Sequence, residues 1–151
     1  MQHRQWEVRV SRHKDGKIEL LRGVPLFANL DEGELEQVGR HADEISVPSG
    51  QVLVTQDTAG NSFYVIVEGA ADVVRDGTKL ADLGAGDFLG EMALLEDLPR
   101  SATVTTTAPT RVLEMHRRDF SSVLDEAPHL ARKMLATMAH RLRHADEQLV
   151  T

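Results

Sequence analysis

The sequence predicts a mainly β fold with flanking α-helices: a jelly-roll-like β-barrel with an N-terminal helical segment and two C-terminal helices. The central residues 45–115 contain short apolar runs separated by turn residues, which is typical of closed antiparallel barrels. On either side, residues 18–44 and 117–150 carry apolar side chains at helical spacing. With 151 residues, the chain is long enough for one domain with a substantial core.

The N-terminal part divides into a tail and a helical segment. Residues 1–17 are polar, and we expect a loosely attached tail with at most a short edge strand near Val8. Residues 18–44 are expected to be helical, with a break at residues 23–25. A second helix should begin after Asp31, because aspartate is a favourable N-cap residue. The folded domain, which comprises these helices, the barrel and the C-terminal helices, is therefore predicted to span residues 18–151.

Strands within the barrel region are indicated by runs rich in β-branched and aromatic residues. These runs are residues 52–54, 63–67, 71–74, 103–107 and 111–115. The pair Asp76-Gly77 is a strong signal for a two-residue hairpin turn. A barrel of this kind provides a concave interior.

The C-terminal part is predicted to form helices over residues 117–125 and 128–150, and Pro128 suits the first turn of the second helix. Apolar residues recur along that helix at alternating spacings of four and three. One interpretation is a face packed on the barrel, and the other, which we favour, is a homodimer formed helix against helix. The residues of this stripe are Ala131, Leu135, Met138, Leu142, Ala145 and Leu149.

Composition excludes several classes of protein. The chain has no cysteine, so disulfides and thiolate metal sites are absent and a reducing compartment is expected. It has no apolar run of about 18 residues and no apolar signal core, so we expect a cytoplasmic location and no membrane partner. A formal net charge of −7 argues against nucleic acid as a partner, and we expect no DNA-binding element in this chain.

The stretch of residues 84–104 carries most of the chemistry. Its glycines, Gly84, Gly86 and Gly90, allow positive φ and close approach of the backbone to a ligand. The sequence EMALL favours a short helix, whose free N–H groups would attract an anion. Arg100 offers a planar charged fork for a phosphate, and Glu91 would then have to face a neutral group such as a sugar hydroxyl. The alternative is an ordinary turn with an exposed ion pair of Arg100, contributing about 0–1 kcal/mol.

The string GEMALL, a short acidic spacer and PRSATV closely resembles the phosphate-binding cassette of cyclic nucleotide-binding domains. This resemblance covers residues 88–104 without a gap. The phrase LLRGVPLFANLDEGELEQV is similar to the helical bundle that precedes the barrel in that family. Residues 120–149 resemble the helices that follow the barrel in bacterial catabolite activator proteins.

The resemblance implies a cyclic nucleotide as ligand, with cAMP favoured over cGMP. Its phosphate would be held by Arg100 and neighbouring backbone N–H groups, and Glu91 would accept a hydrogen bond from the ribose 2′-hydroxyl. Apolar side chains of neighbouring strands would cover the ribose and base. The residues implied to contact the ligand are Gly90, Glu91, Met92, Ala93, Arg100, Ser101, Ala102, Val73 and Leu80.

Base recognition follows the family pattern less closely. Where relatives place polar base-reading residues late in the last helix, this chain has Ala145 and Asp146. Asp146 could accept from an amino group of the base, or Arg141 could stack on it.

A sensor function is therefore expected, in which the ligand closes the C-terminal helices over the barrel. We expect no catalysis, because residues 42–115 contain no histidine for a metal enzyme of this barrel shape. His140, His144 and Glu147 could in principle bind a metal, but they are better explained as a solvated face, and no metal is expected. The alternatives are a ligand-free interaction module of the same fold, or the sensor part of a longer transcription regulator.

Overall fold

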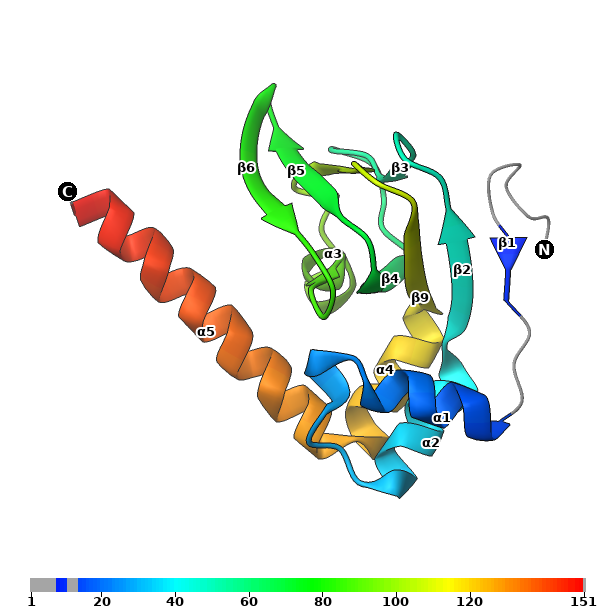
Figure 1. Cartoon of the computed structure of the whole chain (residues 1–151). Coiled ribbons are helices and arrows are strands. Elements are labelled where there is room, and N and C mark those ends of the chain that lie inside the picture. Colours follow the sequence, from blue (N-terminus) through cyan, green and yellow to red (C-terminus); the bar gives the residue numbers. More distant parts are fainter. Residues whose placement is uncertain (1–7, 11–13, 151) are drawn as a thin grey trace.

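The chain folds into two antiparallel sheets, with helices covering one of them (Figure 1). The computed structural model describes residues 8–10 and 14–150, with the side chains of all except residues 14, 15, 92 and 144–150. The five-stranded sheet has the order β1 (Val8–Arg9), β2 (Asp43–Val47), β9 (Thr110–His116), β4 (Ser62–Glu68) and β7 (Phe88–Leu89). The four-stranded sheet has the order β3 (Val52–Val54), β8 (Thr103–Thr106), β5 (Ala71–Arg75) and β6 (Thr78–Leu83).

Strand β4 is buried on both faces, and its side chains alternate between two apolar clusters. Phe63 and Val65 belong to the cluster shared with the helices, whereas Tyr64 and Ile66 belong to the cluster between the sheets. This double burial explains why β4 is apolar throughout rather than alternating with polar residues.

The helices are α1 (Lys14–Arg22), the 3₁₀ turn η1 (Pro25–Phe27), α2 (Glu32–His41), α3 (Glu91–Leu95), α4 (Arg117–Glu126) and α5 (Pro128–Val150). In Figure 1, α1, α2 and α4 gather below the strands with the start of α5, whereas α3 lies at the level of the strands. The predicted N-cap is confirmed: the Asp31 carboxylate accepts from Glu34 N, and the Glu34 carboxylate accepts from Asp31 N.

The observed elements differ from the sequence prediction in several places. The helical segment predicted over residues 18–44 ends earlier, with α2 at His41, because Asp43 and Glu44 pair with β9 as the start of strand β2. Helix α1 begins at Lys14, inside the segment predicted to be a tail, because its first turn is polar and its buried residues, Ile18 and Leu21, come later. Strand β6 was not predicted as a separate run, since most of its residues are exposed and its apolar pattern is weak. The hairpin between β5 and β6 at Asp76-Gly77 is confirmed.

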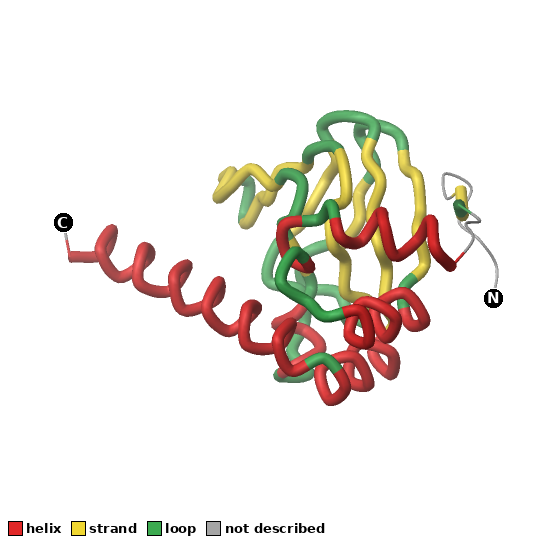
Figure 2. The backbone as a smooth tube through the Cα atoms, turned by 60° about the horizontal axis from the view of Figure 1, so that its bottom comes forward, coloured by secondary structure: helices red, strands yellow, loops and turns green. Residues whose placement is uncertain are grey.

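Helix α5 projects away from the body of the protein, as Figures 1 and 2 show. Near its start, Leu130 and Met134 are buried in the helical cluster, whereas Leu135 and Leu142 are 67% and 65% exposed. The interpretation that this stripe packs on the barrel is therefore wrong for Leu135 and Leu142. The side chain of Leu149 lies outside the described residues.

Two histidine contacts hold α2 against the C-terminal helices. His41 Nδ1 lies 2.9 Å from Asp119 Oδ1 of α4, and His129 Nδ1 at the start of α5 lies 2.6 Å from Glu34 Oε1. Within the described part of the chain, no helix is both long and apolar enough to cross a membrane.

Candidate functional site

A pocket of about 580 Å³ lies beside α3 and opens between strands of both sheets. Apolar side chains of β5, β6 and β8 form its walls, and one end is formed by the residues around α3 and Arg100. The volume lies in the range typical of small-molecule sites. The sequence-predicted residues that line the pocket are Gly90, Glu91, Ala93, Arg100, Ser101, Ala102, Val73 and Leu80, while the side chain of Met92 is outside the described residues.

Arg100 points into the protein and is only 7% exposed. Its Nη2 donates to Ser62 O at 2.7 Å and its Nη1 donates to Gly90 O at 3.2 Å. Both contacts fix the plane of the guanidinium, and they use two of its five N–H groups. Among the described residues, no hydrogen bond of the other three N–H groups is found, and Arg100 lines the pocket, so these donors can face an anion there. The alternative of an exposed turn with a surface ion pair is therefore wrong.

Burial also shapes the electrostatics of Arg100. It lowers the pKa of the guanidinium from its ordinary value, while Tyr64 and Glu91 oppose this shift. An arginine nonetheless stays protonated in proteins. A buried positive charge is costly unless it is paired, which favours an anionic ligand beside it.

Two glycines allow the backbone to approach Arg100 closely. A Cβ on Gly90, which has a φ of +92°, would lie 2.6 Å from Arg100 Nη1 and 2.7 Å from Ser62 O. A Cβ on Gly60 would lie 2.5 Å from Ala93 Cβ and 2.8 Å from Arg100 Cζ. Of the three glycines for which the sequence allowed positive φ and close approach, Gly86 and Gly90 have positive φ. Gly84 does not, and a Cβ there would meet nothing within 4 Å.

Glu91 is the first residue of α3 and is 7% exposed. Burial raises the pKa of its carboxyl, an effect that its own backbone N–H, Arg141 and Arg100 oppose. Arg141 of α5 reaches this end of the pocket: its Nη1 lies 3.9 Å from Glu91 Oε1, and its Cζ lies 4.8 Å from the centroid of the Phe88 ring. Helix α5 therefore supplies a cation at the pocket, while the side chain of Asp146 lies outside the described residues.

Several residues of the site carry no sequence signal that we recognised. Gly60 and the Ser62 carbonyl group contact Arg100 from a segment that looked like an ordinary turn before a strand. Phe88 lies in the cassette string, but its stacking with Arg141 depends on the position of α5. Arg117 contacts the end of α3 and pairs with Asp97, whereas the sequence only placed it at the start of a predicted helix.

The sequence of this chain is similar to those of known proteins. A profile of the family described as "Cyclic nucleotide-binding domain" matches residues 44–127. A cAMP-dependent protein kinase regulatory subunit of Yarrowia lipolytica is 36% identical over 109 residues, which is 72% of this chain. A cyclic AMP receptor protein of Thermus thermophilus is 30% identical over 134 residues, or 85% of this chain.

Solved structures agree with the fold. The catabolite activator protein of Thermus thermophilus matches with a TM-score of 0.74 and 31% identity, covering 83% of this chain and 61% of that chain. A domain from Methylobacillus flagellatus matches with a TM-score of 0.77 over 96% of this chain and 88% of that one, at 22% identity. The chain spans only 29% of the Yarrowia protein and 62% of the Thermus receptor, so the activities of these whole proteins do not transfer directly.

Proposed function

The chain belongs to the cyclic nucleotide-binding domain family, and from that premise we propose that it binds cAMP as a regulatory sensor without catalytic activity. The observation that carries this proposal is the buried, doubly anchored Arg100 in the pocket. Its remaining N–H donors and the N–H groups at the start of α3 suit the single negative charge of a ring phosphate. Ser101, which also lines the pocket, adds a hydroxyl donor.

Glu91 supports recognition of the ribose. Its carboxylate lines the pocket close to the phosphate end and can accept a hydrogen bond from the 2′-hydroxyl. A ligand without that hydroxyl would remove one hydrogen bond to the buried carboxylate, which costs about 1–3 kcal/mol. We therefore expect the pocket to discriminate against a 2′-deoxy cyclic nucleotide.

Arg141 supports a role for α5 in covering the base. The guanidinium lies over the Phe88 ring, and a purine beside it would offer a second π surface. Val73 and Leu80 line the opposite apolar wall. Stacking alone does not distinguish adenine from guanine, so the preference for cAMP draws on the names of the Yarrowia and Thermus relatives.

We further propose that α5 mediates a homodimer. Leu135 and Leu142 are exposed and one heptad apart, which suits a helix–helix seam. Ligand binding would then pull α3 toward the phosphate and move α4 and α5, altering the seam. The ligand can drive this change only through a difference in its affinity for the two states.

The direct test is calorimetric titration of the whole chain with cAMP, cGMP, 2′-deoxy-cAMP and 5′-AMP. Arg100→Ala should weaken cAMP binding at least about 100-fold, since each hydrogen bond to a charged group contributes about 1.5–3 kcal/mol. Arg100→Lys keeps the charge but not the fork, and guards against loss of folding as the explanation. Arg118→Ala, which removes an exposed arginine, is the matched control.

The outcomes separate the two candidate functions. Binding of cAMP that depends on Arg100 supports the sensor. If none of the four nucleotides releases heat or shifts the melting temperature, the sensor proposal is wrong and the ligand-free interaction module replaces it.

A further inference from the structure

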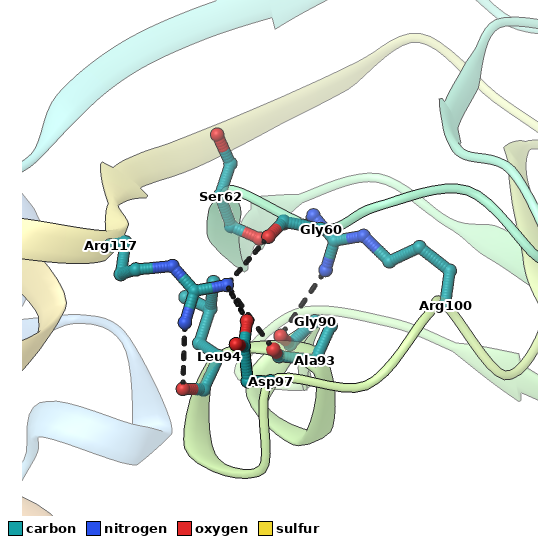
Figure 3. A network of polar contacts seen from close by, with 8 residues as sticks. All are labelled: Gly60, Ser62, Gly90, Ala93, Leu94, Asp97, Arg100 and Arg117. Carbon is teal, nitrogen blue, oxygen red and sulfur yellow. Dashed lines mark hydrogen bonds and ion pairs between the residues drawn. The ribbon is translucent and has the colours of Figure 1, made fainter.

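The backbone from Gly60 to Ser62 lies between two guanidinium groups (Figure 3). On one side, Arg100 Nη2 donates to Ser62 O at 2.7 Å. On the other, Arg117 Nη2 donates to Gly60 O at 2.9 Å, and the main-chain N–H of Arg117 donates to Asn61 O at 3.0 Å. The arginine of the pocket and the arginine that begins α4 are thus joined through one short segment.

Arg117 also holds the far end of α3. Its Nη1 donates to Leu94 O at 3.1 Å, and its Nη2 lies 3.4 Å from Ala93 O and 3.2 Å from Asp97 Oδ1. The last carbonyl groups of a helix have no partner within the helix, and a cation placed there is favourable. The N-terminal end of the same short helix faces the pocket, so Arg117 fixes α3 from the side opposite the ligand.

The carbonyl contacts outweigh the ion pair. The Asp97 side chain is 89% exposed, and an ion pair so open to water contributes little to stability. The hydrogen bonds to Leu94 O and Gly60 O, in contrast, require both branches of a planar fork, which a lysine ammonium group does not provide.

We propose that Arg117 is a positioning residue that sets the orientation of α3 and transmits its displacement to α4. The proposal rests on the proposed function for its ligand-dependent part. Arg117 is the first residue of α4, so its main chain belongs to the C-terminal helices while its side chain holds α3. A displacement of α3 toward a ligand therefore either carries the start of α4 with it or breaks these hydrogen bonds.

The test compares Arg117→Gln and Arg117→Lys with Arg118→Ala and Asp97→Asn in the whole chain, after thermal melting has shown that each variant folds. Without ligand, hydrogen exchange of the α3 amides should be about fivefold or more faster in Arg117→Gln than in wild type. Arg117→Lys should recover part of this protection. Arg118→Ala removes the same charge from the next, exposed residue and should leave exchange in α3 unchanged, as should Asp97→Asn.

The ligand-dependent part uses cAMP and cGMP as probes. Arg117→Gln should raise the Kd about tenfold and abolish the ligand-induced change of exchange in α4 and α5, while protection at Arg100 and Ser101 persists. Wild-type exchange of the α3 amides in Arg117→Gln, with wild-type affinity, overturns the positioning role. If wild type binds neither nucleotide, the proposed function fails, but the measurement without ligand still decides whether Arg117 positions α3.

Discussion

Gly60→Ala is the sharpest test of how the site is packed. Gly60 is not part of the cassette string, and its neighbours in sequence suggest an ordinary turn. In the structure, a Cβ at this position would lie 2.5 Å from Ala93 Cβ and 2.8 Å from both Arg100 Cζ and Arg100 Nε. The added methyl group would therefore meet the two parts of the pocket that bind the phosphate in our proposal.

The size of the effect follows from these distances. Carbon atoms in contact normally lie about 3.5–4.0 Å apart, so the added methyl group and Ala93 Cβ must separate by about 1 Å. The Ala93 Cβ is attached directly to the backbone of α3 and cannot rotate away, so α3 or the Gly60 segment must move. Overpacking of this kind costs about 1–3 kcal/mol of stability. If the shift of Arg100 loses one charged hydrogen bond to the phosphate, affinity falls about 10- to 100-fold.

Calorimetric titration with cAMP and a thermal melt of the same samples measure both effects. Gly84→Ala is the matched control, because a Cβ there has no neighbour within 4 Å and the residue needs no positive φ. We expect Gly84→Ala to melt and bind as wild type does. Wild-type affinity and melting temperature in Gly60→Ala would refute the close packing of Gly60, α3 and Arg100.

Three further predictions concern charge, pH and assembly. Glu91→Gln should stabilise the ligand-free protein by about 1 kcal/mol in urea unfolding, because burial raises the pKa of this carboxyl and makes its ionised form costly. The same substitution should weaken cAMP binding. Unchanged stability and affinity would contradict this prediction. Burial alone would raise the pKa of Glu34, but hydrogen bonds from His129 and Asp31 lower it below its ordinary value. The stabilising effect of Glu34 is therefore present above the ordinary pKa and is lost as pH falls through the folded-state pKa. The difference in unfolding free energy between wild type and Glu34→Gln should therefore shrink from pH 6 to pH 3, and a constant difference would count against it. Replacing Leu135 and Leu142 together by glutamate should convert a sedimenting dimer to monomer without lowering the melting temperature of the barrel, whereas a wild type that is already monomeric at high concentration rules out the seam.

The sequence alone was sufficient to predict those elements whose own residues carry a local signal. Asp31 has a short side chain suited to capping, and Asp76-Gly77 readily adopts the backbone conformation that a tight hairpin needs. Within a helix, proline is tolerated in the first turn, where Pro128 lies. The cassette string likewise predicted α3 and brought Gly90 and Arg100 into one site. In each case, the property that determines the structure belongs to a few adjacent residues.

Features that depend on distant contacts were not predictable in this way. Lys14 begins a helix whose stability comes from Ile18 and Leu21 packing against other elements. The first turn of this helix is polar, which is why the sequence alone assigns it to the N-terminal tail. The contacts of Arg117 with Leu94 O and Gly60 O join residues 23 and 57 positions apart. The identity of an arginine does not reveal such partners, because its long side chain fits equally well in water.

The formal charges around the pocket have a consequence for how a signal would end. Arg100 and Arg141 contribute two positive charges and Glu91 one negative charge, so a cyclic phosphate with one negative charge would bring the sum to zero. Hydrolysis that opens the ring leaves a phosphate with about −1.5 to −2 charges at neutral pH. Under the proposed function, the ring-opened product would place an uncompensated negative charge beside a buried carboxylate, so the pocket should hold it less tightly than the cyclic nucleotide.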